Sequence, residues 1–301
     1  VVESQKRDLV ELALKLGWDF VPVFLTYSAQ REYHPPRFID QNSWEGEYGN
    51  IWRYSSVTED ILCVKPKELT WEDIKTLEEP FVPDDSELEL VRDVVARLGG
   101  SHFIVGRTAI ELRDAQPIMG RGCTDGTFPE PYGGLLMDIT AFAYKMADEP
   151  DFIKELLAAS TKRAIEVGKV LIREGVDAIV MDTDYCHNQG PWISPRHFEE
   201  FVLPLLKKEC DAFHEAGAYV IKHTDGNAWP ILDMVVETGI DGLHGIQPSA
   251  GMDIKRLKEK YGDGVIIKDP GQLGAVLVSC EDKNLTINQM LKEFDIEYNM
   301  N

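Results

Sequence analysis

The sequence predicts an α/β protein of the (β/α)8 barrel type, with one domain over residues 1–301. Short apolar, β-branched runs alternate with helices, and each run follows a Gly that ends a helix. The runs lie at residues 178–181, 219–221, 240–243 and 265–267. A Gly just past a helix end permits the turn that reverses the chain, and such alternation is typical of a parallel sheet. No G-x-G-x-x-G and no phosphate-binding loop follows any run, which disfavours the doubly wound alternative.

The helices carry their own start signals. Ser194 and Pro195 provide an N-cap and a first-turn Pro, and apolar residues then recur at helical spacing. Residues 151–173 form a second amphipathic helix, and Pro230 opens a short one. Thr70 caps another short helix in the first half of the chain.

The first half of the chain is less regular. Residues 20–25 and 103–105 are expected to be two further strands of the same sheet. Residues 30–90 are rich in Pro, Trp, Tyr and acids and have weak periodicity. We interpret them as an elaborate loop that contains an antiparallel hairpin, with strands near residues 51–54 and 61–64.

The composition excludes several classes of partner. The chain has 31 Lys and Arg against 52 Asp and Glu, which is a formal net charge of −21. Such a surface repels polyanions, so nucleic acids and anionic membranes are not expected partners. No apolar stretch is long enough to span a membrane, and the start lacks the features of a signal peptide. Because the chain begins without Met inside an amphipathic pattern, we expect a trimmed N-terminus.

The five cysteines are scattered and form no C-x-x-C pair. This usage is typical of a reducing compartment, so we expect a cytoplasmic protein. The cysteines are interpreted as small buried apolar residues.

Polar residues gather directly after the predicted strands, where a barrel places its chemistry. Three of the seven histidines lie there beside carboxylates. This density on neighbouring loops indicates a metal or acid–base site. The residues at these strand ends are Tyr27, Arg107, Glu111, Arg113, Asp182, Asp184, Tyr185, His187, Lys222, His223, Asp225, Asn227, His244 and Gln247.

The pair formed by His223 and Asp225 has its own geometry. On an extended strand, residues i and i+2 point the same way, so both side chains converge on one point. Gly226 then permits a tight turn and leaves room for a ligand. The alternative is a carboxylate that only orients the His. The other histidines are interpreted as structural, with His214 on a helix surface: His34, His102, His197 and His214.

From residue 175 to about 271 the sequence resembles the uroporphyrinogen decarboxylase superfamily. The similar segments are GVDAIVMDTD, ISPRHFEEFVLPLLKK and HTDGNAWPILDMVVETGIDGLHGIQPSAGMDI. Upstream, EYGNIWRYSS is similar to a hairpin of the methyltransferase-like members. The resemblance implies a distorted barrel with an N-terminal hairpin and loop elaboration and a cleft at the strand C-termini. It also implies one of two activities, that of the decarboxylase or that of the cobalamin-dependent methyltransferases.

The residues favour the methyltransferase branch. The decarboxylase grips the carboxylates of a tetrapyrrole with paired arginines, and VPVFLTYSAQREYHPP lacks them. Thiol-methylating members bind zinc through a His-x-Cys pair and a later Cys. His223 matches that His, Asp225 stands where the Cys would be, and Cys280 is too loosely placed to complete the set. A carboxylate-rich site makes zinc a harder Lewis acid, suited to an ether or alcohol oxygen.

The leading hypothesis is therefore a zinc-dependent methyltransferase. It would move a methyl group from a methylated small molecule, with an aryl methyl ether as one candidate, to a corrinoid protein. The alternatives are a decarboxylase of uroporphyrinogen or a related acid, and a non-catalytic barrel that binds a ligand or a corrinoid protein. The expected zinc ligands are His223, Glu111 and Asp225. The expected catalytic residues are Asp182, Asp184, Tyr185 and His187, and the expected substrate-binding residues are Tyr27, Arg113, Asn227, His244 and Gln247.

Overall fold

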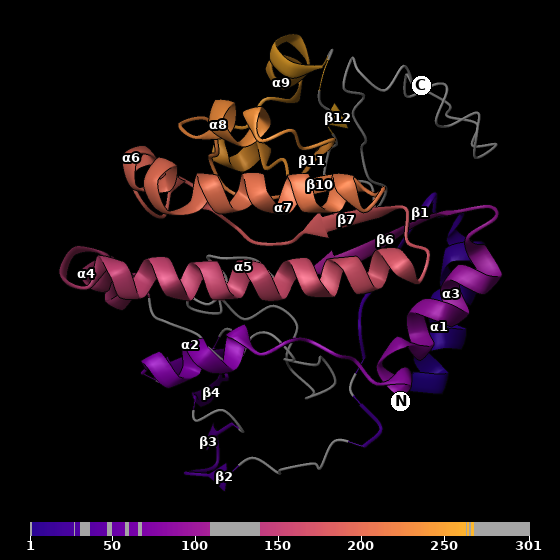
Figure 1. Cartoon of the computed structure of the whole chain (residues 1–301), viewed down its shortest axis with the longest axis horizontal. Coiled ribbons are helices and arrows are strands. Elements are labelled where there is room, and N and C mark those ends of the chain that lie inside the picture. The colour runs from indigo at the N-terminus through magenta and orange to yellow at the C-terminus, as the bar shows by residue number, and fades with distance from the viewer. Residues whose placement is uncertain are drawn as a thin grey trace.

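The computed structural model describes residues 2–26, 28–30, 37–46, 50–57, 60–65, 68–108, 139–262, 264 and 266–267. A six-stranded parallel sheet lies behind the long helices in Figure 1. In order of pairing, its strands are β1 (Phe20–Val23), β6 (Phe103–Thr108), β7 (Ala178–Met181), β10 (Tyr219–His223), β11 (Gly242–His244) and β12 (Ile266–Ile267).

The strands pair in the order in which they occur in the chain, and every pair is parallel. A doubly wound sheet reverses its winding at a switch point, whereas a barrel is wound in one direction. The structure therefore confirms the predicted α/β class with the winding of a (β/α)8 barrel. Each predicted strand of this sheet is present and begins within two residues of its expected position.

The helices pack against this sheet through their apolar faces. α5 lies against β6 and β7, α7 against β10, and α3 against β1 and β6. Figure 1 shows α5 and α7 side by side in front of the strands. No helix of the described segments has the length and apolar character needed to cross a bilayer. The helices are α1 (Val2–Leu16), α2 (Trp71–Glu78), α3 (Glu89–Leu98), α4 (Ile139–Asp148), α5 (Pro150–Arg173), α6 (Pro195–His197), α7 (Leu203–Glu215), α8 (Leu232–Glu237) and α9 (Ile254–Tyr261), with short turns of other helical types at Asp85–Leu88, Phe198–Val202 and Pro248–Ala250.

The predicted caps stand at helix starts. Oγ of Ser194 accepts the N–H of His197 at 3.2 Å before α6 and α7. Thr70 and Asp73 form a reciprocal capping box at the start of α2. Each cap satisfies an N–H that the first turn of a helix leaves without a partner.

A second sheet corrects the expectation for residues 30–90. The sequence predicts a loop with one hairpin, but the structure has four antiparallel strands. The two additional strands are too short to show an alternating pattern, which is why only the longer hairpin can be predicted. The strands are β2 (Arg37–Phe38), β3 (Ser43–Glu45), β4 (Ile51–Ser55) and β5 (Asp60–Lys65). A further two-stranded hairpin follows β7 and consists of β8 (Cys186–His187) and β9 (Gly190–Pro191).

Two carboxylates, part-buried Asp177 and fully buried Asp241, join the strands at their N-terminal ends. Asp177 precedes β7 and accepts the N–H of Ile104 in β6 at 2.7 Å. Asp241 precedes β11 and accepts the N–H of Val220 in β10 at 2.8 Å. Asp241 also lies 2.6 Å from Nε2 of His214, which is only part-exposed. The expectation that His214 is a plain surface residue is therefore corrected, because its ring contacts a fully buried carboxylate.

The contact between α5 and α7 predicts the effect of one substitution. A Cβ on Gly168 would collide with the ring of Phe213, which is fully buried. Gly168→Ala is expected to lower the free energy of unfolding by about 1–3 kcal/mol, because the added methyl group overpacks this contact. Urea unfolding measures the change. Gly100→Ala is the matched control, since a Cβ there meets nothing within 4 Å, and equal stabilities of the two variants would contradict the prediction.

Candidate functional site

One face of the sheet carries charged residues where the strands end. A Cβ on Gly106 would lie 3.0 Å from Leu171 of α5, so this position of β6 faces the helices. The next residue, Arg107, therefore faces the opposite side, and its register partner is Val180 in β7. Asp182, which is two residues after Val180, forms an ion pair with Arg107. The face turned away from α5 is thus the polar one.

Two imidazoles lie next to each other at the ends of β10 and β11. His223 and His244 are register partners, so their side chains share a face. Their Nδ1 atoms are 2.7 Å apart and their ring centroids 4.8 Å apart. One Nδ1 donates to the other, which orients the ring of His223. Its Nε2 then lies 3.4 Å from Oδ1 of Asp184.

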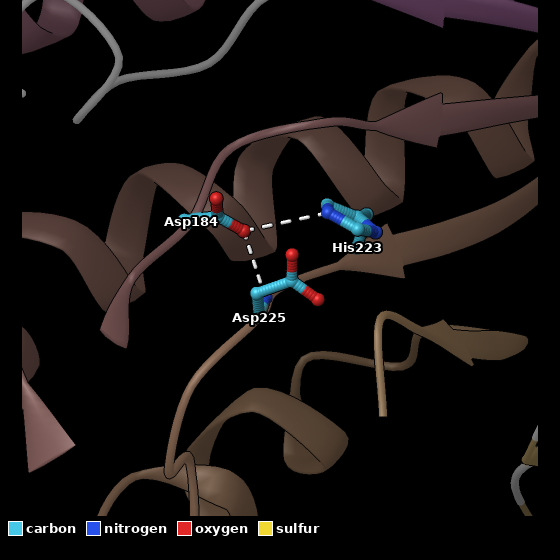
Figure 2. Close-up of side chains that lie close together, drawn as sticks. All are labelled: Asp184, His223 and Asp225. Carbon is cyan, nitrogen blue, oxygen red and sulfur yellow. Dashed lines mark hydrogen bonds and ion pairs between the residues drawn. The ribbon is translucent and has the colours of Figure 1, made fainter. Parts of the chain in front are cut away.

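Asp184, His223 and Asp225 form the candidate functional site (Figure 2). Asp184 lies in the loop after β7, His223 ends β10, and Asp225 follows it. One ligand atom from each residue lies within 4.8 Å of the others. Oδ1 of Asp184 also accepts the N–H of Asp225 at 2.7 Å, which joins the two loops. The structure therefore brings two of the predicted zinc ligands together with a residue that the sequence places among the catalytic ones.

The electrostatics and donor chemistry of this site suit a divalent cation. Burial alone would raise the pKa of Asp184. Hydrogen bonds from the ring of His223 and from the amide of Asp225, with the positive charge of Lys222, outweigh burial and hold that pKa below its ordinary value. Asp184 is therefore ionised at neutral pH. Two carboxylates and one imidazole are a donor set that zinc accepts, and three protein ligands leave a coordination position for a substrate oxygen.

Two glycines allow the backbone segments around the site to approach one another. Gly245 has a φ of 86°, and a Cβ there would lie 2.8 Å from Nδ1 of His223. Gly226 has a φ of 83°, and a Cβ there would lie 2.7 Å from the carbonyl oxygen of His187. The interpretation that Gly226 leaves room for a ligand is corrected. The main chain of residues 186–187 occupies that space.

Two of the predicted substrate-binding residues, Gln247 and Asn227, hold the surrounding loops. Oε1 of Gln247 accepts the N–H of Gly226 at 2.8 Å, and its Nε2 donates to Oδ1 of Asn188 at 3.0 Å. Oδ1 of Asn227 accepts the N–H of Trp229 at 3.2 Å. These contacts give both residues a structural role, and their contact with substrate stays a prediction.

The segment after β7, from Tyr185 into the hairpin, contains both buried and part-exposed residues. Tyr185 is fully buried and packs edge-on against Phe198, with ring centroids 5.1 Å apart, so we leave it out of the proposed catalytic groups. Burial raises the pKa of the Cys186 thiol to about 12, so this residue offers no thiolate ligand at neutral pH. His187 is part-exposed, and its Nδ1 accepts the N–H of Gln189 at 3.3 Å.

Other residues qualify the sequence-based site. Tyr27, Glu111 and Arg113 lie outside the described residues, as does Cys280, so their assignments stay predictions. The sequence assigns no role to Lys222, yet this residue is fully buried beside the site. The position of this Lys at the end of an apolar strand was the feature of the sequence that could have indicated its burial.

The sequence matches the uroporphyrinogen decarboxylase family over residues 64–268, more than half of the chain. The chain belongs to the uroporphyrinogen decarboxylase family. Among solved structures, a methyltransferase from Methanosarcina mazei is similar, with a TM-score of 0.58 and 17% sequence identity. The alignment covers 90% of this chain and 71% of that chain. A search of the curated proteins finds no match.

The family match includes all three residues of the candidate site. At 17% identity, the likeness to the Methanosarcina methyltransferase establishes a shared fold. The site of this uroporphyrinogen decarboxylase family member therefore has to be interpreted from its own side chains.

The close approach at Gly245 predicts a test of the site. In Gly245→Ala the new methyl group would collide with the ring of His223 and displace it from its present position. We expect the affinity for Zn²⁺ or Co²⁺, measured by competition with a chelating dye, to fall about 10–100-fold. Gly251→Ala is the control, because Gly251 has a φ of 84° but nothing within 4 Å of a Cβ. Equal metal affinity in both variants would contradict the geometry.

Proposed function

We propose that this family member is a zinc-dependent methyltransferase that moves a methyl group from a methylated small molecule to a corrinoid protein. We propose an aryl methyl ether as the class of methyl donor. The observation that carries the proposal is the convergence of Asp184, His223 and Asp225 at the strand C-termini, where barrel enzymes hold their substrates. The fold shared with a methyltransferase is compatible with it.

The donor set indicates the kind of bond that would be broken. When bound by two carboxylates and an imidazole, zinc would supply a hard Lewis acid, better matched to an ether or alcohol oxygen than to sulfur. Asp184 is ionised without help from a metal, so no proton has to leave this carboxylate when the ion binds. His244 would keep Nε2 of His223 directed at the same point. The chain thus preorganises its ligands.

Other side chains would handle the substrate. Nδ1 of His187 accepts a local N–H, so in the neutral ring Nε2 carries the proton. We assign to this N–H a hydrogen bond to the leaving oxygen, which would stabilise its negative charge, because His187 lies in the loop next to the site. Asp182 is bound to Arg107, and we propose that this pair orients the substrate.

A uroporphyrinogen decarboxylase activity is the second candidate, because the family match favours it. A substrate with many carboxylates needs several Arg side chains to bind it. Arg37 and Arg107 each already have a carboxylate partner, Glu45 and Asp182 respectively. The described arginines near the predicted loops are therefore engaged within the chain, which argues against a tetrapyrrole substrate.

The methyltransferase proposal predicts metal content and activity together. Gently purified protein should contain stoichiometric zinc by elemental analysis, and it should methylate cob(I)alamin from a panel of aryl methyl ethers. His223→Ala should lose the metal and lower the rate by more than about 100-fold, since removing a ligand costs more than removing an outer-shell partner. The absorbance change of the corrinoid measures the rate.

His197→Ala is the matched control for that experiment. His197 lies in α6, is exposed, packs on Phe201 with ring centroids 6.1 Å apart, and is not among the three residues of the candidate site. This variant should retain both zinc and activity. A metal-free wild-type protein that transfers no methyl group would overturn the proposal. Decarboxylation of uroporphyrinogen would establish the second candidate, and ligand binding that survives in His223→Ala without turnover would establish the non-catalytic barrel.

A further inference from the structure

We propose that Lys222 is a positioning residue that sets the distance between Asp184 and the pair His223 and Asp225. The inference rests on the proposed metal site and concerns how this chain builds it. Lys222 lies in β10 directly before His223, and its side chain has no exposed surface. A wholly buried ammonium is costly unless its N–H groups are matched by acceptors, so its partners indicate its role.

The partners of Lys222 are main-chain carbonyls on two different strand ends. Its Nζ donates to the carbonyl oxygen of Thr183 at 2.6 Å, of His223 at 2.7 Å and of Met181 at 3.3 Å. An ammonium has three N–H donors and no acceptor, so three carbonyls match it fully. Nζ also lies 3.9 Å from the ring centroid of Tyr185, where the face of the ring attracts a cation.

These carbonyls lie where the sheet stops pairing. Met181 and Lys222 are the last register partners of β7 and β10. Thr183 lies beyond that point and is buried, so its carbonyl oxygen needs a hydrogen-bond donor that the sheet does not supply. The ammonium of Lys222 is that donor. Its hydrogen bonds therefore take the place of the backbone pairing that ends at Met181. They link the segment that carries Asp184 to the one that carries His223.

Two further hydrogen bonds connect the same segments. The N–H of Tyr185 donates to Oγ1 of Thr224 at 3.0 Å, and the N–H of Asp225 donates to Asp184 at 2.7 Å. Lys222 differs from both because it binds main-chain atoms on each side and lies on the face turned toward the helices. Without it, the loop after β7 would shift relative to His223 while the sheet below remained paired.

The test compares two buried charged residues at opposite ends of the same sheet. Lys222→Met removes the link at the C-terminal end of β10, and Asp241→Asn alters the link at its N-terminal end. Both variants are expected to unfold at lower urea concentration. Only Lys222→Met should weaken Co²⁺ binding, by about 10–100-fold, and alter the visible absorption bands of the Co²⁺-loaded protein. Lys222→Arg should fold with an altered Co²⁺ spectrum, because a planar fork cannot reproduce three diverging donors.

The outcomes separate this inference from the proposed function. Wild-type Co²⁺ affinity and spectrum in Lys222→Met would overturn the positioning role. If that variant does not fold, an unchanged spectrum in Lys222→Arg would overturn it. A wild-type protein that binds no metal contradicts the proposed function. In that case the ring ¹⁵N chemical shifts of His223 test the positioning role of Lys222. They should move in Lys222→Met or Lys222→Arg and not in Asp241→Asn, and unchanged shifts would overturn the inference.

Discussion

The hydrogen bond from the amide of Asp225 to the carboxylate of Asp184 joins the two loops on which the candidate site depends. A carboxylate that accepts a backbone N–H and faces an imidazole is a weaker base than a free one, so it stays charged over a wider pH range. The same hydrogen bond holds the main chain of Asp225, from which its side chain extends, next to Asp184. His223 completes the group from the end of β10, where its ring contacts that of His244 in β11.

An aspartate at position 225, compared with the cysteine of the thiol-methylating pattern, differs in more than the ligand atom. A cysteine ligand has to lose its proton, whereas an aspartate near neutral pH brings its charge with it. The buried thiol next to the site, Cys186, remains protonated because it is withdrawn from water. The donors that the described residues bring to the candidate site are therefore oxygen and nitrogen atoms. That distinction separates this chain from the thiol-methylating pattern that its sequence otherwise resembles.

The sequence predicts local features well because their causes are local. The caps at Thr70 and Ser194 and the strands of the parallel sheet depend on neighbouring residues, and they are where the pattern places them. The antiparallel sheet is only partly predictable, since strands as short as β2 owe their pairing to partners rather than to periodicity.

The site shows the same division. His223 and Asp225 follow from spacing along one strand, whereas their meeting with Asp184 depends on how two strands align. Tyr185 and Asp184 are consecutive but face opposite sides, and no spacing rule at a strand end reports which one faces the core. The apolar strand that Lys222 continues indicates its burial, but its role cannot be predicted because its partners are carbonyl groups, which leave no trace in the sequence.

The aspartates that precede β7 and β11 hold the sheet from the end remote from the candidate site. The alignment of the strands is therefore set by one rim of the molecule while the ligand-bearing loops occupy the other. Selection can exchange residues on the ligand-bearing rim without first losing the scaffold beneath it. An exchange of the ligand side chain at position 225 therefore leaves in place the hydrogen bonds of Asp177 and Asp241, which join β6 to β7 and β10 to β11.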